Sequence, residues 1–567
     1  MERVDEIETE RLLPGIDGAE LMDELIQHAD SSGCFQKVFN NLFNFCAVFF
    51  GVMSVYSLVL AMEVPDHWCH VPGRDSTNFS LSEWKNLTLP RDKDSGDNIG
   101  YSKCKMYNVT GPLDGSDNVS NLSIIDCQYG WEYDGSWFSK TVPSQENWVC
   151  DKNLYVTNTF VATQIGDAVG TISFGHMSDS IGRRPVFLIS LALLITGRGL
   201  SVMSAAYYPL YLITVFLGHS GLTSLSFAAT TIGIELSSVE RRAHVVMLQS
   251  LGWTGGMCLI PLLAWLTGDW VSFVLLPLLP TLGIFICAKS LFRESPRWLA
   301  SGGKIEQCME YLQYIATINK QLLPEGTKDT LQKIAEQGKG RVYGPASFFS
   351  SVRLAVNTTL VIVCWMMNTF SYGVLLLNVN NMPGNPFFNF FCQAAVEFPA
   401  NIIAKWLSDR VGRRFTHTAT FLLVSGSCFG VATMINKPSL HIVSTAVVTF
   451  IRFCVTITNF VCYLQGMEIF PTCLRQTGMS IANLAGNVTG ILAPYVVYLG
   501  SNMNQKYPYI VLGSVAILAT ITTAFLPETH NKKLPDNIKD AKYFGSNQKF
   551  WSFFPTCSAD TEDRSPN

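Results

Sequence analysis

The chain has 567 residues, of which 48% are hydrophobic and 15% are charged, and its formal net charge is -4. Soluble proteins carry about 25% charged residues, so this composition excludes a disordered chain and argues against a soluble multidomain enzyme. The near-neutral charge excludes the overall basic character of a nucleic-acid-binding protein. The composition favours a protein that is surrounded in part by lipid.

Apolar segments long enough to cross a bilayer recur along the chain. A transmembrane helix needs about 20 mostly apolar residues. Twelve segments qualify, in two groups of six: 38–62, 154–177, 185–206, 209–234, 243–267 and 269–291, then 354–378, 387–408, 415–435, 440–465, 477–500 and 507–527. We therefore predict an all-α membrane protein of twelve transmembrane helices in two pseudo-symmetric six-helix bundles.

The remaining segments complete the predicted domain organisation. They are an N-terminal segment (1–37), a first bundle (38–291) that contains a polar loop (63–153), a linker (292–353), a second bundle (354–527) and a tail (528–567). The linker has a helical pattern of apolar residues that is broken by Pro324 and Gly326, which predicts short helices.

Basic residues in the short loops predict the orientation. Arginines gather on one side of the predicted membrane, namely Arg183, Arg184, Arg241, Arg242, Arg410, Arg413, Arg414 and Arg475, whereas the opposite short loops offer little beyond Lys437 and Lys506. We expect the arginine side, both termini and the linker to be cytoplasmic, in a multi-pass plasma-membrane protein. Residues 1–30 have no apolar core of signal-peptide type, so the first span is the expected insertion signal.

This orientation places the loop between helices 1 and 2 outside the cell. Five N-x-S/T sequons begin in it, at Asn78, Asn86, Asn108, Asn118 and Asn121, against two elsewhere, at Asn357 and Asn487. We predict a large, folded, glycosylated extracellular loop. Its four cysteines, Cys69, Cys104, Cys127 and Cys150, are expected to form two disulfides, with all three pairings open.

A motif recurs two spans into each half. Residues 175–185 read G-H-M-S-D-S-I-G-R-R-P, and residues 405–414 read K-W-L-S-D-R-V-G-R-R. Gly182 and Gly412 permit a tight turn between helices. The aspartate of each motif can accept hydrogen bonds from a neighbouring helix N-terminus or an arginine.

With this repeat the sequence resembles the major facilitator superfamily. Further segments resemble its organic cation, carnitine and organic anion transporter branch: P-D-H-W-C (65–69), W-V-C-D (148–151), E-S-P-R-W-L (294–299), V-E-F-P (396–399), E-I-F-P-T (468–472) and L-P-E-T (526–529). The resemblance extends from about residue 36 to residue 540. Sugar porters share several of these motifs, but the long first loop argues against them because such porters are expected to have a short one.

Ionisable residues inside spans are costly and therefore candidate functional groups. They are Asp167, Arg198, Glu397 and Arg452, with His219 and His441 as weaker cases. For each of them a buried structural ion pair is the alternative interpretation.

The resemblance implies roles for several of these positions. Glu397 matches an acidic position of the family's binding site and would attract an ammonium group. Arg452 matches a basic position and would either pair with Glu397 or hold a substrate carboxylate. Tyr372 matches an aromatic residue that would contact a cation or pack between helices. Gln249 and Trp253 are further candidates.

Two positions depart from the family pattern. Asn487 occupies a position where cation carriers tend to have aspartate and carnitine or anion carriers arginine, and Asp167 stands where an apolar residue is usual. One additional acid and one missing charge favour small organic cations or amine-bearing zwitterions as substrates. An organic anion is the alternative substrate class.

The resemblance also implies alternating access without a covalent step. Asp179 with Arg183 and Asp409 with Arg413, helped by Glu235 and Arg242, would hold the outward-facing state. No enzyme motif or metal-spaced cluster is present, so we expect no catalytic activity, cofactor or metal. The expected partners are a small organic solute and the bilayer. A non-transporting membrane receptor is the alternative of a different class.

Overall fold

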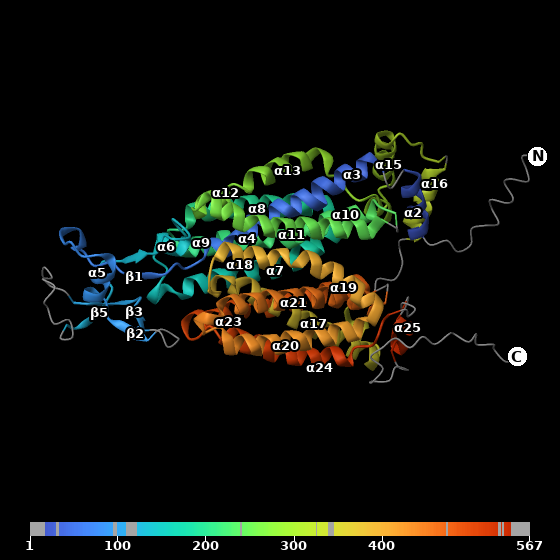
Figure 1. The fold of residues 1–567 in the computed structure, drawn as a ribbon. Coiled ribbons are helices and arrows are strands. Elements are labelled where there is room, and N and C mark those ends of the chain that lie inside the picture. Colours follow the sequence, from blue (N-terminus) through green and yellow to red (C-terminus); the bar gives the residue numbers. More distant parts are fainter. Residues whose placement is uncertain are drawn as a thin grey trace, which may run out of the picture.

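The computed structural model describes residues 18–29, 33–93, 99–108, 122–238, 241–324, 326–337, 345–471, 474–530, 535 and 538–545. Long helices run roughly parallel and form an elongated bundle (Figure 1). Short strands and helices, which we call the cap, extend from one end of the bundle. The opposite end carries short helices and is called the linker end.

The N-terminal half packs its helices closely through small residues. Its elements are α3 Cys34–Phe39, a π-helical stretch Asn40–Cys46, α4 Ala47–Ala61, α7 Leu154–Ser180, α8 Arg183–Ser204, α9 Tyr208–Ser220, α10 Leu222–Glu235, α11 Arg242–Thr267, α12 Trp270–Leu275 and α13 Leu278–Leu291. Gly166 and Gly170 bring α7 against the backbone of α9, since a Cβ at Gly170 would lie 2.1 Å from the Ser220 carbonyl oxygen. Small residues allow such close approach between apolar helices.

The C-terminal half contains corresponding elements. They are α17 Val352–Leu377, a 3-10 turn Asn378–Asn381, α18 Pro386–Ala395, α19 Glu397–Val411, α20 Arg413–Met434, α21 His441–Ile469, α22 Arg475–Gly490, α23 Ala493–Asn502 and α24 Tyr507–Phe525. The predicted continuous span 387–408 is interrupted at Val396. Pro399 has no N–H to bond the Ala395 carbonyl, which explains the break.

Three other predicted spans are also interrupted. The helix over 209–234 breaks at Gly221, the one over 269–291 breaks at Leu276 and Pro277, and the one over 477–500 breaks at Ile491 and Leu492. A proline lies at or just after the last two breaks, at Pro277 and Pro494. The sequence pattern therefore located these apolar segments but missed their internal bends.

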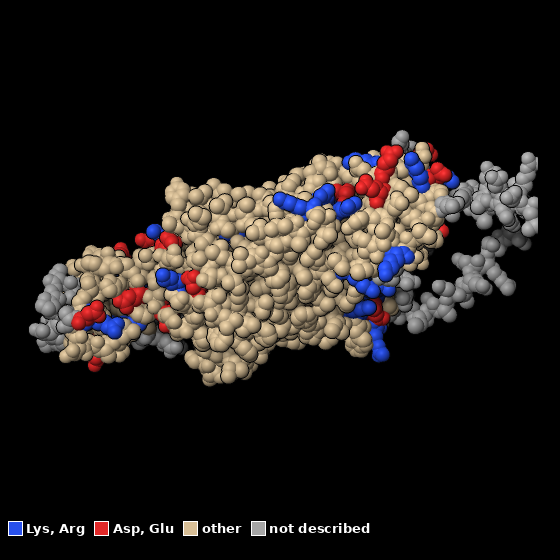
Figure 2. Space-filling model, turned by 90° about the horizontal axis from the view of Figure 1, so that it is seen from above, with Lys and Arg blue, Asp and Glu red and all other residues tan. Residues whose placement is uncertain are grey.

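Ten helical segments of the described residues are long and apolar enough to cross a membrane: Cys34–Ala61, Arg183–Ser204, Tyr208–Glu235, His244–Thr267, Trp270–Leu291, Val352–Asn381, Arg413–Met434, Pro438–Ile469, Thr477–Asn502 and Tyr507–Phe525. Helix α7 and the α18–α19 pair are not among them. α7 contains several polar residues, and α18 and α19 are separate short helices. Figure 2 shows lysine, arginine, aspartate and glutamate toward the two ends of one face, with a broad uncharged band between them.

The described residues of the cap form three small antiparallel sheets and two short α-helices. The strand pairs are β1 His67–Cys69 with β6 Trp131–Tyr133, β2 Arg91–Lys93 with β3 Ile99–Tyr101, and β4 Lys105–Tyr107 with β5 Ile124–Asp126, and the helices are α5 Leu81–Thr88 and α6 Val142–Glu146. Disulfides join Cys69 to Cys127 and Cys104 to Cys150. The prediction of two disulfides is confirmed, and the structure selects one of the three pairings.

Four short helices pack together at the linker end. They are α2 Gly18–His28, α14 Pro296–Ser301, α15 Ile305–Asn319 and α16 Thr327–Gln337. Met22, Leu25 and Ile26 of α2 share an apolar cluster with Leu312 and Leu331. A further helix, α25 Ile538–Tyr543, lies at the same end (Figure 1).

The halves meet along two seams: α7 contacts α22 and α23, and α11 contacts α18 and α19. Side-chain hydrogen bonds between the described residues of the two halves lie near the cap or in the middle of the bundle. Near the cap, Asn380 donates to the Val59 carbonyl at 2.8 Å, and Asn153 bonds with Tyr498 and Asn502. The described ion pairs at the linker end lie within one half, join one half to the short helices, or join two short helices to each other.

Candidate functional site

The central group of polar side chains forms around a buried ion pair. Glu397, at the start of α19, accepts a hydrogen bond from Arg452 of α21, with Nη2 to Oε1 at 2.6 Å and side-chain exposures of 5% and 1%. Tyr372 of α17 donates from Oη to the same Glu397 oxygen at 3.0 Å. Its ring centroid lies 3.6 Å from the Arg452 guanidinium carbon. The structure thus brings together three residues that the resemblance implied for one site.

The N-terminal half supplies the other side of this group. On α11, Trp253 donates from Nε1 to the Tyr372 hydroxyl at 3.4 Å, and Thr254 donates to Glu397 Oε2 at 3.4 Å. Tyr56 of α4 packs edge-on against Trp253, with ring centroids 5.4 Å apart. Both carboxylate oxygens of Glu397 therefore have protein donors, and the positive charge of Arg452 balances the acid.

Sequence reasoning missed two of these residues. Tyr56 and Thr254 are uncharged and lie in apolar runs, so nothing in the pattern marks them as costly to bury. Gln249, one turn before Trp253 on α11, is partly exposed and has no hydrogen bond to the ion pair among the described residues.

A second acidic group lies on α7. Asp167 accepts a hydrogen bond from the hydroxyl of Thr223 on α10. One turn further along α7, the Thr171 hydroxyl donates to the Asp167 carbonyl at 2.8 Å and accepts from Asn487 Nδ2 of α22 at 3.4 Å. The Tyr56 phenol lies within electrostatic range of Asp167, Glu397 and Arg452. Thr171 therefore links the two positions that depart from the family pattern, through the backbone carbonyl of Asp167 and the side chain of Asn487, at the seam between the halves.

Arg198 serves the interior of one half. Its Nε donates to the Ser54 carbonyl at 2.8 Å and its Nη2 to the Ser57 hydroxyl at 3.3 Å, both from α4. A Cβ on Gly218 of α9 would lie 3.0 Å from the Arg198 side chain. These contacts connect α8 with α4 and α9 and assign Arg198 to packing of the N-terminal half.

The repeated motifs build matching helix starts at the linker end. Gly182 and Gly412 have φ values of +107° and +103°, a conformation that favours glycine. After each glycine a carboxylate accepts two backbone N–H groups. Glu294 accepts from Arg183 and Arg184 at 2.9 and 3.1 Å, and Glu528 accepts from Arg413 and Arg414 at 3.0 and 3.0 Å.

Sequence reasoning quoted the segments that contain Glu294 and Glu528 but gave these residues no role. An available signal was that each acid directly follows the last helix of its half, where the chain returns to the same end as its motif. Carboxylates at helix N-termini are stabilised by the unpaired N–H groups and the helix dipole.

The predicted gating residues fall into two groups, one in each half. Arg183 lies 3.7 Å from Glu235. Arg413 lies 3.3 Å from Asp409 and 3.2 Å from Glu468. The side chain of Asp179 is outside the described part of the chain. Arg242 pairs at 2.6 Å with Asp23 of α2, which also contacts Arg297; Asp23 was not predicted.

Three of the five predicted glycosylation sites in the cap can be placed. Asn78, Asn86 and Asn108 are exposed, whereas Asn118 and Asn121 lie outside the described residues. The Asn86 amide oxygen accepts hydrogen bonds from Arg91 and Tyr101, both at 2.9 Å.

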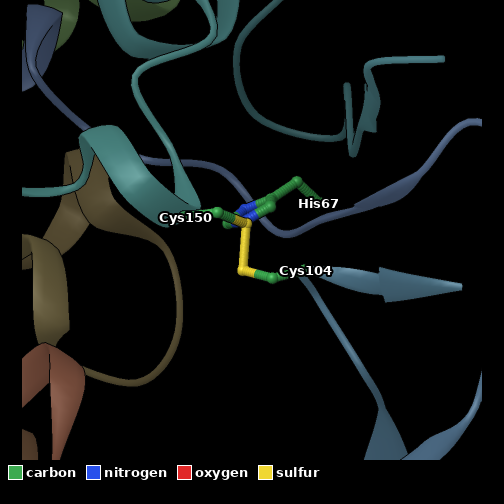
Figure 3. Close-up of side chains that lie close together, drawn as sticks. All are labelled: His67, Cys104 and Cys150. Atoms are coloured by element: carbon green, nitrogen blue, oxygen red, sulfur yellow. A yellow bond between two sulfur atoms is a disulfide. The ribbon is translucent and has the colours of Figure 1, made fainter. Parts of the chain in front are cut away.

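Figure 3 shows the imidazole of His67 beside the Cys104–Cys150 disulfide. The potential ligand atoms of these three residues lie within 4.8 Å of one another. Both sulfurs are joined to each other, so neither is available as the thiolate that binds a metal. Burial lowers the pKa of His67 below its usual range.

Glu63 lies two residues beyond α4 at the cap end. Its Oε2 atom is buried and has no partner among the described residues. Burial raises the pKa of Glu63 to about 8. Glu63 lies about one helical turn after Val59, whose carbonyl accepts the hydrogen bond from Asn380.

An apolar groove of about 570 Å³ runs between α11 and α18. It is lined by Phe49, Leu259, Leu262, Trp265, Phe387 and Phe391, among others. Several of these side chains belong to segments apolar enough to cross a membrane, so the groove suits contact with lipid chains rather than with a polar solute.

Comparison with known proteins gives consistent matches over most of the chain. The profile of the family described as "Sugar (and other) transporter" matches residues 129–537. The carcinine transporter of Drosophila melanogaster is 26% identical over 96% of this chain and 82% of its own length. The human organic cation/carnitine transporter 2 is 28% identical over 91% of this chain and 93% of its own. Human solute carrier family 22 member 7 is 30% identical, covering 92% and 96%.

Solved structures share the fold. The xylose transporter XylE from E. coli, in an inward-open conformation, superimposes with a TM-score of 0.60 at 15% identity, covering 89% of this chain and 99% of the other. The relatives are transporters rather than enzymes. The chain belongs to the sugar (and other) transporter family of the major facilitator superfamily, in its organic cation, carnitine and organic anion transporter branch, solute carrier family 22.

Proposed function

We propose that this protein is a plasma-membrane secondary carrier that moves small organic cations or amine-bearing zwitterions by alternating access. The observation that carries the proposal is the central group of Glu397, Arg452, Tyr372, Trp253 and Asp167, which lies where the two halves meet. The carcinine and carnitine transporters among its relatives support a solute with an amine or quaternary ammonium group.

The topology that accompanies this function has twelve spans. Ten of these spans are the apolar segments. The other two are α7 and the α18–α19 pair, which run along the bundle beside the apolar segments (Figure 1). The cap is extracellular and glycosylated, and both termini and the linker helices are cytoplasmic. The arginine-rich motifs at the linker end support this orientation.

In the proposed site, the aromatic faces of Tyr372, Trp253 and Tyr56 receive the cationic group of the solute. Asp167 and Asn487 contact the solute from α7 and α22, and Gln249 from α11. Because Arg452 neutralises Glu397, we assign this pair chiefly to holding α19 and α21 together around the solute. Arg452 also gives a zwitterion's carboxylate a partner when Glu397 moves away.

Gating is proposed to involve Asp179, Arg183, Glu235 and Arg242 in one half and Asp409 and Arg413 in the other. In the structure Arg183 lies beside Glu235 and Arg413 beside Asp409, each pair within its own half. Closure of the linker end brings the two groups together, and ion pairs across the seam then hold the outward-facing state.

Radiotracer uptake by cells that express the chain tests this function. The panel contains carcinine, carnitine and a dicarboxylate, each measured at two membrane potentials, because a monovalent cation that crosses without a counter-ion gains about 2.3 kcal/mol per 100 mV. Saturable carcinine or carnitine uptake supports the proposal. Uptake of the dicarboxylate alone indicates an anion carrier, and surface expression without uptake indicates a receptor.

Variants of Asn487 test the substrate class further. We expect Asn487→Asp to increase the preference for cations and Asn487→Arg to increase the preference for anions. Surface biotinylation of each variant controls for delivery to the membrane. Unchanged preferences in both variants would contradict the assignment of Asn487 to the site.

A further inference from the structure

Asp167 differs from the other acid of the central group in its partners. Glu397 is paired with Arg452 and accepts hydrogen bonds on both oxygens. Asp167 accepts one side-chain hydrogen bond, from the neutral hydroxyl of Thr223, and within the described part of the chain it forms no ion pair. The negative charge of Asp167 therefore has no positive counterpart among the residues that the structure describes.

Asp167 also lies on the surface of α7 that faces the other half. Gln164, Asp167 and Thr171 follow one another at helical spacing and so share a face. A Cβ at Gly490 of α22 would lie 3.0 Å from the Gln164 amide oxygen, and Asn487 of α22 donates to Thr171. Asp167 is thus located between two contacts with α22, at the seam that must slide during transport.

The helices packed against α7 offer no charge to this carboxyl group. Their ionisable side chains are Arg183, Arg184 and Arg198 on α8, Tyr208, Tyr211 and His219 on α9, Glu235 on α10, Arg475 on α22, and Tyr495 and Tyr498 on α23. As far as the structure describes them, none of these side chains hydrogen-bonds or pairs with Asp167. The phenol of Tyr56 on α4, which is uncharged in its ordinary state, lies within electrostatic range of Asp167.

An ionised carboxylate without a counter-charge is costly in an apolar interior. Two species can remove this cost: a proton bound to the carboxylate, or a cation beside it. The ammonium group of an organic cation is such a species when the site is loaded. Proton and solute therefore compete for one group.

We propose that Asp167 couples transport to protons, so that the carrier exchanges one organic cation for one proton. This coupling rests on the proposed function. With the empty site open to the outside, Asp167 is protonated. Binding of the ammonium group breaks the O–H bond, and the proton leaves to external water. After the solute leaves on the inside, a proton from internal water binds Asp167, and the neutral group returns outward.

The net charge moved in each cycle determines how uptake depends on the membrane potential. A monovalent cation that enters while one proton leaves transfers no net charge, so a clamped membrane potential leaves its uptake unchanged. A zwitterion that enters by the same exchange moves one positive charge outward, so an interior-negative potential slows it. Uptake of both is driven by an interior more acidic than the exterior.

Proteoliposomes containing the full-length chain provide the test, with labelled carcinine and carnitine as probes. A gradient of about two pH units, acidic inside, supports up to about 100-fold accumulation in one-for-one exchange. We expect accumulation of at least about 10-fold under that gradient and none at equal pH. An internal pH-sensitive dye should report alkalinisation when probe is added. Empty liposomes control for passage of free base.

Asp167→Asn should lose both gradient-driven accumulation and proton efflux, whereas Asp167→Glu should retain both. Asp329→Asn, in an exposed turn of α16, is the matched control and should behave as wild type. Accumulation independent of the pH gradient in wild type, or gradient-driven accumulation in Asp167→Asn, would overturn the coupling. Either of these two outcomes contradicts the coupling but leaves the proposed function standing, because saturable uptake is still observed. Absence of saturable uptake of both probes overturns the proposed function and the coupling with it. If Asp167→Asn does not reach the membrane, wild type and Asp167→Glu decide the question by the same gradient.

Discussion

The carboxylate of Glu397 and the guanidinium of Arg452 lie 2.6 Å apart in the middle of the bundle, with both side chains almost fully buried. They belong to α19 and α21, helices of the same half, and Tyr372 of α17 contacts both of them. The most deeply buried charges near the seam are therefore neutralised by the protein itself. Asp167, in contrast, accepts a hydrogen bond from the neutral Thr223 and forms no ion pair among the described residues.

Breaking the Glu397–Arg452 pair should destabilise the protein. Removing one partner of a buried ion pair typically costs about 3–5 kcal/mol, because the other charge remains uncompensated. We expect Glu397→Gln and Arg452→Met each to lower thermal stability in detergent strongly. The double variant should lose less than the sum of the two, with a coupling of about 0.5–3 kcal/mol.

The exposed pair of Lys328 and Glu306, 3.8 Å apart, is the matched control. Removing either of these side chains should cost about 1 kcal/mol or less. Additive effects at Glu397 and Arg452 would show that their contact is not the source of the stability.

The two carboxylates at the starts of α8 and α20 should contribute similarly to stability. Glu294→Gln and Glu528→Gln each remove a charge and one acceptor for backbone N–H groups, and we expect each to cost about 1–2 kcal/mol. Thermal unfolding of the purified protein measures the loss. Glu306→Gln, an exposed glutamate at the start of α15, is the control and should have little effect. A loss at only one of the two sites would contradict their structural equivalence.

Glycosylation tests the orientation of the cap. Substituting Asn78, Asn86 or Asn108 by glutamine should each reduce the electrophoretic mass by one glycan, because all three side chains are exposed. Enzymatic deglycosylation of the wild type should remove the difference. Asn357→Gln and Asn487→Gln are controls, since these asparagines are buried in α17 and α22 and should not change the mass. If the cap carries no glycans, the proposal that it is extracellular is contradicted.

Glu63 predicts a pH dependence of stability. Its pKa is about 8 in the folded protein, against about 4.3 for an exposed glutamate. Between these values the folded protein holds a proton that the unfolded chain has lost, so stability falls as the pH rises through this window. We expect the melting temperature of Glu63→Gln to fall less than that of the wild type between about pH 5 and pH 8, by about 1–3 °C. Equal pH profiles would contradict the assignment.

The parts of the fold that follow local chemistry were predictable from the sequence. The glycines of the repeated motif predicted the turns at Gly182 and Gly412, which have positive φ. Apolar length located most of the helices. Pro399 marked its span as prone to kink, but the position of the break at Val396 and the break near Pro494 were not predicted, because they depend on which carbonyl loses its partner when a proline follows.

The ionisable residues of the site were predictable from the sequence because charges are costly to bury in a membrane span. Its neutral residues were not predictable. Asp167, Glu397 and Arg452 were identified because ionisable groups are rare within apolar segments. Thr223, Thr254 and Tyr56 are common residues in such segments, and only tertiary contact shows their role. The cysteine pairing likewise depends on which strands of the cap adjoin.

Asp23 is a different case. The spacing of Met22, Leu25 and Ile26 on α2 is typical of an amphipathic helix, so this element was readable from the sequence. The ion pair between Asp23 and Arg242 could not be predicted from the sequence, because the two residues are far apart in the chain.

The hydrogen bonds that join the halves near the cap involve only amides, a phenol and a backbone carbonyl. Neutral hydrogen bonds contribute about 0.5–1.5 kcal/mol each, so these bonds add only a few kcal/mol to the apolar contacts that hold the halves together at this end, such as that of Phe138 with Phe387. No charge is stripped of its counterion when the halves part there, and mobile ions shield neutral dipoles little. The first stage of turning the carrier outward should accordingly proceed at nearly the same rate in dilute buffer as in concentrated salt.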